Sequence, residues 1–309
     1  MEKNMNINFA CLKDRVLDAL DKTDLEYIRN ELLQLKEPTI VSGVGGSSVV
    51  SEIVSKVIRK KNEIITKNME PRDFNYDNLK GYKNVLSCSY SGNNYGVDLA
   101  FNNNLKHYLL SNNAFNDLNT TYLTYNTSIE KERSFISLGA TLIPITIVMD
   151  YYLNGQKKFL LEQIQSIKID NNIDIQTDIY EIFTGYDTSM TSKYLESTMV
   201  ESGIGIPIIH DKYSYCHGRS TTAINCKSNV IYLNRDTDLD KLLIDELLQY
   251  HKLILVIDSK FKDDLLDDYQ MLIKAMYLTK FIANQKQKDL SKVNYSPIVK
   301  KLYKYNGKI

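Results

Sequence analysis

The sequence predicts an α/β protein of two units, each with a mainly parallel sheet covered by helices on both faces. Three observations support this prediction. Short β-leaning runs alternate with helical runs, as in proteins whose parallel strands are joined by helical crossovers. The alternation then occurs a second time along the chain. Finally, 309 residues are enough for two cores of ordinary size.

In the first half, an opening helix is indicated by Leu25, Ile28 and Leu32, which fall on one helical face, with Thr23 and Asp24 as a start signal. Small and polar residues separate the strand-like and helical runs that follow. The other elements expected there are a strand over 39–42, a helix over 47–59, strands over 63–66 and 85–89, a helix over 94–105, a strand over 121–125 and a helix over 130–153.

The second half repeats this order after a linking helix. The expected elements are helix 159–167, strand 180–184, helix 191–202, strands 206–209 and 230–233, helix 239–250, strand 253–258 and helix 263–284. An Asn-, Asp- and Ile-rich stretch over 168–177 marks the expected boundary. The predicted units are therefore residues 1–167 and 168–309.

Composition narrows the class of protein. Lys plus Arg and Asp plus Glu both total 38, so no global field favours nucleic acid or an anionic membrane. The first residues lack the order of a signal peptide, and the longest apolar run, near 142–149, suits a buried helix better than a membrane span. The four cysteines show no Cys-x-x-Cys spacing. We therefore expect reduced thiols, no metal site and a cytoplasmic protein.

Two Ser/Gly segments carry the clearest functional signal: Val-Ser-Gly-Val-Gly-Gly-Ser over 41–47 and Ser-Cys-Ser-Tyr-Ser-Gly-Asn over 87–93. Each joins a strand to a helix, where small residues and free N–H groups suit a phosphate. The first segment alone fits a tight turn without a ligand equally well. It is no Walker loop, and Ser48 stands where a dinucleotide fingerprint needs glycine. Two such turns on neighbouring strands predict a phosphate pocket.

Both segments resemble the sugar isomerase (SIS) domain family, whose turns read G-x-G-x-S and S-x-S-G-x-T. The resemblance is strongest to the bifunctional phosphoglucose/phosphomannose isomerases, with GMGGS and SYSGNT. It implies two tandem SIS-type three-layer αβα units. Asn94 replaces the family's threonine, so an amide would stand in for a hydroxyl. The segment 132–137 resembles the start of the family's long helix and adds Arg133. The residues implied to hold the phosphate are Gly45, Ser47, Ser89, Ser91, Gly92 and Asn94.

Glu201 and His217 are the candidate catalytic pair. Taken alone, a glutamate on a helix is usually a solvated residue, and Glu196, five positions earlier, points elsewhere around the helix. In the isomerase domain of glucosamine-6-phosphate synthase a helix glutamate precedes a loop histidine by the sixteen residues found here. The resemblance implies that Glu201 moves a proton between C1 and C2 through a cis-enediol. It also implies that His217, from a neighbouring subunit, opens the sugar ring.

The chain departs from the family at two nearby positions and resembles it at the tail. Thr198 replaces a lysine of the synthase, and Arg219 replaces the proline that follows His-Gly in many members. Arg219 would then be a second anion ligand. The tail resembles the family's P-x-x-L-x-K-V segment, whose lysine reaches the site. Lys301 is the matching residue, with Lys300 as the alternative.

The sequence thus predicts a homodimeric sugar-phosphate aldose–ketose isomerase that needs no metal or organic cofactor, because fixed charges can stabilise an enediolate. Two alternatives stay open. One is a non-catalytic sugar-phosphate binder that acts as a regulator or sensor. The other is a different reaction on a phosphorylated sugar, such as deglycation or ether cleavage, since one fold hosts many chemistries.

Overall fold

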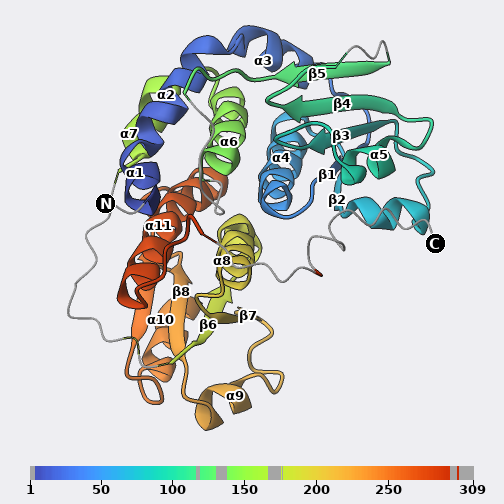
Figure 1. The fold of residues 1–309 in the computed structure, drawn as a ribbon. Helices are drawn as coiled ribbons and strands as arrows, with labels where there is room; N and C mark the ends of the chain where they lie inside the picture. The colour runs from blue at the N-terminus through green and yellow to red at the C-terminus, as the bar shows by residue number, and fades with distance from the viewer. Residues whose placement is uncertain are drawn as a thin grey trace.

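The computed structural model describes residues 4–115, 119–129, 138–165, 175, 177–292 and 298 (Figure 1). The helices are α1 (Asn4–Ala10), α2 (Leu12–Lys22), α3 (Leu25–Leu33), α4 (Gly46–Asn62), α5 (Tyr95–Phe101), α6 (Leu138–Tyr152), α7 (Lys157–Gln163), α8 (Ser189–Ser202), α9 (Ser220–Asn225), α10 (Asp238–Leu247) and α11 (Asp264–Gln285), with short 3₁₀ turns η1 (Pro71–Asn75) and η2 (Tyr186–Thr188). The strands are β1 (Thr39–Ser42), β2 (Thr66–Met69), β3 (Asn84–Cys88), β4 (Lys106–Ser111), β5 (Thr120–Thr124), β6 (Ile179–Thr184), β7 (Ile206–Asp211), β8 (Asn229–Asn234) and β9 (Ile254–Asp258).

The strands form two parallel sheets. The first has the order β2-β1-β3-β4-β5, and the second has the order β7-β6-β8-β9. In the first sheet β1 lies between β2 and β3, and the register places Ser42 opposite Ser87. In the second sheet β6 lies between β7 and β8. The predicted α/β fold with mainly parallel sheets is confirmed.

Four helices, α4, α6, α8 and α11, form the layer between the sheets (Figure 1). Their apolar side chains and the inward faces of both sheets make one continuous core. The first sheet's outer face packs on α5 and η1, and the second sheet's on α10. Helix α6 is apolar on all sides and buried over most of its length, as the apolar run near 142–149 predicted. The two sheets and the helices between them therefore share one core.

Several helices begin where a side chain satisfies the free N–H groups of the first turn. Asp24 accepts from the N–H of Tyr27 at the start of α3, as the start signal predicted. Thr237 and Asp240 form a reciprocal capping box on α10. Asp263 accepts from two backbone N–H groups at the start of α11. These caps fix where α3, α10 and α11 begin.

The structure corrects the expected elements in several places, and it adds α1, α2 and α9, which the sequence did not predict. Helix α5 ends at Phe101 and a strand, β4, follows it, whereas the sequence suggested a helix to residue 105 and no strand. The reason is Asn103, whose side chain donates to Ala100 O and accepts from Leu105 N, so it ends the helix with a local turn. Helix α4 likewise continues to Asn62, which delays the next strand to Thr66.

Some predictions fall outside the described residues. Most of the expected boundary, 168–177, is among them, so the division into residues 1–167 and 168–309 stays a prediction. Cys11, Cys88, Cys216 and Cys226 are all free thiols. Within the described part of the chain, every helix is too short or too polar to cross a bilayer.

Candidate functional site

The two Ser/Gly turns lie side by side at the carboxyl edge of the first sheet, as predicted. They follow β1 and β3, which are neighbours in the sheet. The chain leaves β1 through α4 toward β2 and leaves β3 through α5 toward β4, so the crossovers diverge in opposite directions. Such a switch in strand order opens a crevice at the carboxyl ends, where ligands of open parallel sheets bind. A β-carbon on Gly96 of α5 would stand 2.9 Å from Val44, so the turns are in contact.

The first turn is shaped for a close approach of backbone. A β-carbon on Gly43 would stand 2.3 Å from the carbonyl oxygen of Ser47, and Gly45 has a positive φ of 57°. Helix α4, 17 residues long, begins at Gly46. Within the described chain, the exposed N–H groups of Gly45 and Gly46 and the hydroxyl of Ser47 have no hydrogen-bond partner. These donors at a helix N-terminus can bind an anion.

The second turn is held together by Ser89. Its buried Oγ accepts from Gly92 N at 3.1 Å and from Asn94 Nδ2 at 2.7 Å, so its own hydroxyl proton remains available as a donor. Asn94 also caps α5, because its Oδ1 accepts from Val97 N. Ser91 Oγ is exposed and accepts only a long bond, 3.5 Å, from Asn93 N. The amide of Asn94 therefore has a structural task besides the one the sequence suggested.

Glu201 lies beside the first turn. Helix α8 packs along α4 in the opposite direction, so its last turn reaches the first turn of α4. Glu201 Oε1 stands 3.8 Å from the position of a β-carbon on Gly45. Ser197, one turn earlier, donates to the same oxygen at 2.7 Å and orients the carboxylate. The structure thus brings Glu201, from the second unit, to the Ser/Gly turns of the first.

A polar network ties α8 to α4 at the opposite end of this helix pair. Lys56 is 5% exposed and donates to Ser189 Oγ at 2.6 Å, and Ser189 in turn donates to Glu52 at 2.6 Å. Lys193 lies 3.3 Å from Glu52. Burial raises the pKa of Glu52, but the Ser189 hydrogen bond and the two lysines together hold that pKa below its ordinary value of 4.5. The network fixes how the two helices lie together.

The second sheet also has a helix N-terminus at its switch point, but there a side chain of the protein itself binds the free N–H groups. Helix α8 follows β6, at the point where strand order reverses in that sheet. Asp268, fully buried on α11, accepts from Met190 N at 3.1 Å and from Thr191 N at 3.0 Å. An internal carboxylate therefore occupies the place where an external anion would bind. At the first switch point, by contrast, the described residues leave exposed donors without a partner.

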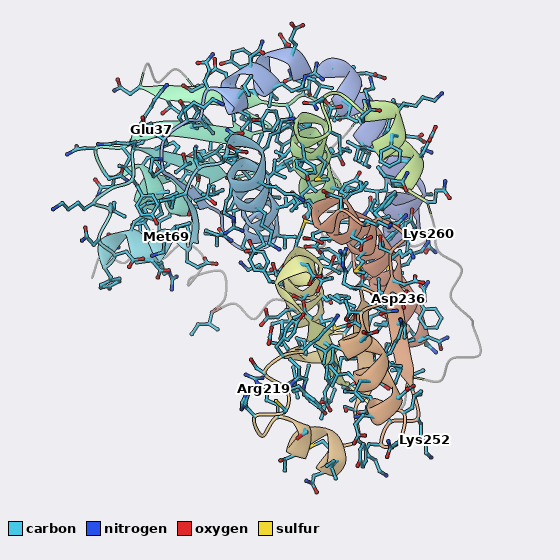
Figure 2. The ribbon with its side chains drawn as sticks, turned by 180° about the vertical axis from the view of Figure 1, so that it is seen from behind. Glu37, Met69, Arg219, Asp236, Lys252 and Lys260 are labelled. Carbon is cyan, nitrogen blue, oxygen red and sulfur yellow. The ribbon has the colours of Figure 1, made fainter. Side chains whose placement is uncertain are left out.

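His217 and Arg219 lie away from Glu201 within one chain. Glu201 precedes β7 and His217 follows it, so the strand's six residues, about 20 Å, separate their places in the fold. Arg219 Nη1 donates to Ile209 O at 3.0 Å. Figure 2 shows Arg219 near the tip of the second unit, far from Met69 at the end of β2. A single chain does not bring Glu201 and His217 together.

Arg133, Lys300 and Lys301 lie outside the described residues. The described chain holds no group of three or more His, Cys, Asp or Glu side chains placed to bind a metal ion. Sequence reasoning missed Ser197 and Asp268. Ser197 had a weak signal, because it stands four residues before Glu201 and so shares its helix face. Asp268 had none, because its partners are distant in sequence.

Solved structures with this architecture are found among phosphosugar proteins. Tagatose-6-phosphate ketose/aldose isomerase from Escherichia coli superposes with a TM-score of 0.75 at 13% identity, over 96% of this chain and 97% of that one. The C-terminal domain of glucosamine-fructose-6-phosphate aminotransferase from Francisella tularensis gives 0.70 at 14% identity, over 95% and 99%. Glucosamine-6-phosphate deaminase from Thermotoga maritima gives 0.58 at 13% identity, over 90% and 98%.

The sequence matches no protein-family model, and no curated protein is significantly similar to it. The likeness to the solved structures therefore establishes the fold. The chain has the fold of phosphosugar isomerases, and this confirms the expected resemblance at that level. The three proteins differ in the reaction that their names describe. The fold therefore does not define what this chain does.

Proposed function

We propose that this protein binds a phosphorylated sugar at the two Ser/Gly turns and interconverts its aldose and ketose forms. The single observation that supports this best is the position of Glu201 beside Gly45. A carboxylate next to a phosphate cradle is the arrangement that proton transfer on a phosphate-anchored sugar requires. The names of the structural neighbours from E. coli and F. tularensis fit a phosphorylated sugar as ligand.

In the proposed complex the phosphate meets the N–H groups of Gly45 and Gly46 and the hydroxyls of Ser47, Ser89 and Ser91. Gly92 and Asn94 shape the second turn around it. Glu201 then removes the proton from C2 of the open-chain aldose, and the carbonyl oxygen O1 gains a proton, which gives a cis-enediol. As the O2 hydroxyl loses its proton, Glu201 returns a proton to C1, which gives the ketose. The proposed site also contains further charged groups when it is assembled: Arg219, Arg133 and Lys301, or Lys300 in place of Lys301. They would stabilise the negative charge that develops on the sugar oxygens.

His217 enters this proposal through a homodimer, in which the histidine of one copy opens the sugar ring at the Glu201 of the other. Support comes from the surface around β7, an edge strand of the second sheet. Three large apolar side chains are mostly exposed there: Val200 (61%), Ile206 (60%) and Tyr213 (72%). Val200 and Ile206 lie near the amino end of β7 and Tyr213 lies beyond its carboxyl end, so a partner that covers all three would lie along the whole strand. A second copy seated on it would cover the apolar residues and supply what one chain lacks.

A non-catalytic phosphosugar binder is the second candidate. Glu201 is exposed in the single chain, and the side-chain amide of Asn94 already donates a hydrogen bond to Ser89. Both observations suit a site that holds a phosphate without transforming the sugar. The same cradle also leaves room for another reaction on a phosphorylated sugar, such as deglycation or ether cleavage.

The test is a thermal-shift panel of hexose and pentose phosphates, each paired with its unphosphorylated sugar, followed by an isomerisation assay on every binder. We expect the phosphorylated sugars to raise the melting temperature of the protein and the unphosphorylated sugars to leave it unchanged. Ser47→Ala should weaken that shift, because its hydroxyl has no structural partner within the described chain. Binding without isomerisation supports the binder. No shift with any phosphorylated sugar overturns the proposed site.

A further inference from the structure

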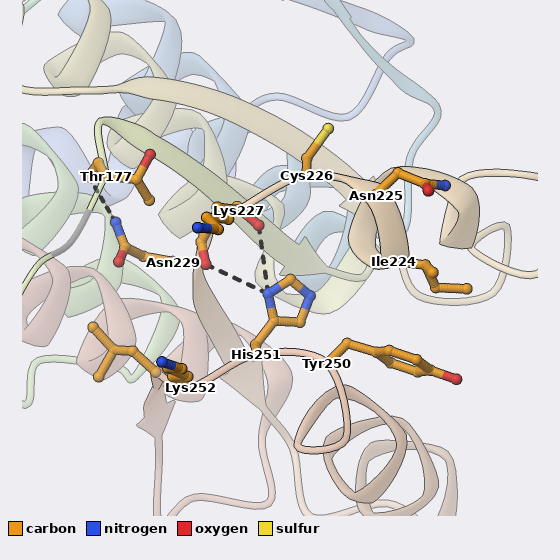
Figure 3. A pocket seen from close by; sticks show the side chains of 11 residues that line it. Thr177, Ile224, Asn225, Cys226, Lys227, Asn229, Tyr250, His251 and Lys252 are labelled. Carbon is orange, nitrogen blue, oxygen red and sulfur yellow. Dashed lines mark hydrogen bonds between the residues drawn. The ribbon is translucent and has the colours of Figure 1, made fainter.

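A cavity lies apart from the Ser/Gly turns, at the amino edge of the second sheet. It measures about 480 Å³ and is formed by the connection from α9 to β8 and the connection from α10 to β9 (Figure 3). Its volume falls in the range of small-molecule sites. The two Ser/Gly turns lie at the carboxyl edge of the other sheet, so this cavity is independent of the site described above.

The charged side chains that line the cavity are positive. Lys227 and Lys252 line it, and both are exposed. The lining includes neither Asp nor Glu from the described chain. Two ammonium groups without a lining carboxylate favour an anionic ligand over a neutral or cationic one.

His251 forms part of the cavity wall and is 5% exposed. Its Nδ1 lies 3.4 Å from Ser228 O and 3.5 Å from Ser228 Oγ. The carbonyl oxygen can only accept, which places the proton of the neutral imidazole on Nδ1. Within the described chain Nε2 has no hydrogen-bond partner. A buried imidazole nitrogen without a partner is costly, and a ligand hydroxyl would satisfy it.

A buried network holds this wall in place. Ser228 donates to Glu181, which is fully buried on β6, and Glu181 Oε2 lies 2.9 Å from His210 Nε2. Burial raises the pKa of Glu181, but the contacts with His210 and Ser228 hold that pKa below its ordinary value of 4.5. Because the Ser228 hydroxyl donates its proton to Glu181, Ser228 Oγ can act only as the acceptor in its contact with His251 Nδ1. The hydrogen bonds of Ser228 and Glu181 therefore fix the orientation of the His251 ring.

We propose that this cavity binds a small hydroxylated organic anion. Its phosphate or carboxylate group lies between Lys227 and Lys252, and its hydroxyl donates to His251 Nε2. The site does not depend on the proposed phosphosugar function, because it shares no residue with it. The ligand's anionic group and its hydroxyl make separate contributions, and each can be tested by leaving it out.

The test follows the imidazole C–H resonances of the full chain by NMR while ligands are added at constant ionic strength. The chain has four histidines, so the His251 signal can be assigned from His251→Asn. The probes are malate against succinate, and glycerol 3-phosphate against inorganic phosphate. We expect saturable shifts of the His251 signal, with tighter binding of the hydroxylated member of each pair. The better pair identifies carboxylate or phosphate as the preferred group.

Lys227→Gln/Lys252→Gln should weaken binding by about tenfold or more, because it removes both charge-assisted contacts. Lys260→Gln/Lys262→Gln is the matched control, since it removes equal charge elsewhere on the surface; Figure 2 shows Lys260 well apart from Lys252. Both lysine pairs are exposed, so we expect the two double lysine variants to fold even if the His251→Asn variant does not. A His251 signal that does not saturate by about 20 mM ligand, or equal weakening in both lysine variants, overturns the proposal.

Discussion

Glu201 places a carboxylate oxygen 3.8 Å from the position that a β-carbon would take on Gly45. Gly45 leads into α4, and Glu201 lies in the last turn of α8. A sugar anchored by its phosphate at the start of α4 would therefore face a carboxylate supplied by the other half of the chain. The separation of anchor and carboxylate is set by how α4 and α8 pack.

Replacing Glu201 by glutamine tests its proposed role in proton transfer. We expect Glu201→Gln to lower kcat on the best phosphosugar by about 100-fold to 10,000-fold, because an amide cannot carry the proton. The ligand-induced rise in melting temperature should persist. Glu196→Gln, an exposed change on the same helix, is the control and should keep nearly full activity. Equal activity of the two variants would remove Glu201 from the mechanism.

Mixing two inactive variants tests whether His217 acts across a dimer. Glu201→Gln and His217→Asn are each expected to be nearly inactive alone. Unfolded, mixed in equal amounts and refolded, they should recover about one quarter of wild-type activity. The reason is that half the dimers are mixed and each of those has one intact site. No recovery in mixed dimers of verified composition would show that Glu201 and His217 do not combine across the interface.

Asn94 is expected to matter for stability as well as for the ligand. Asn94→Ala removes the cap of α5 and a bond to Ser89, and should lower the free energy of unfolding by about 1–2 kcal/mol. Asn94→Thr retains an oxygen for the cap, so it should lose less and should bind the phosphosugar at least as well. Urea denaturation and thermal shifts measure both effects. Equal destabilisation by Ala and Thr would contradict the capping role.

Gly92 combines a positive φ of 65° with a crowded surrounding, since a β-carbon there would stand 2.8 Å from Phe115 Cε2. Gly81 has a φ of 98° and open space. Both alanine variants should suffer backbone strain of about 1 kcal/mol, but Gly92→Ala should lose more because Phe115 must also move. Urea denaturation of the two variants measures the difference. Gly92→Ala should also weaken phosphosugar binding, whereas Gly81→Ala should leave it unchanged.

The network between α4 and α8 gives stability a pH dependence. The folded-state pKa of Glu52 lies below 4.5, so its contribution is complete above pH 4.5 and is lost as the pH falls through the folded-state value. Glu52→Gln should therefore lower the free energy of unfolding by about 1–2 kcal/mol at neutral pH and by less near pH 3. Glu70→Gln, at an exposed position, is the control. A loss that does not change with pH would show that the charge of Glu52 is not what matters.

Much of the candidate site could be predicted from local sequence. A Ser/Gly turn between a β-leaning run and a helical run specifies its own backbone, so 39–42 and the start of α4 were placed almost to the residue. The strand β4 was missed because the Asn-rich stretch before it was interpreted as the end of a helix. There, side chains bonded to nearby backbone decided the outcome, and helix periodicity does not report such bonds.

Sequence by itself determined the α/β class, the two turns and the residue types that suit a phosphate, because these depend on contacts within a few residues. Only the tertiary structure decided which residues meet. It brought Glu201 to Gly45, set His217 at the far end of β7, and filled the second switch point with Asp268. The physical reason is that packing across the shared core joins residues distant in sequence, and a local pattern carries no record of those contacts.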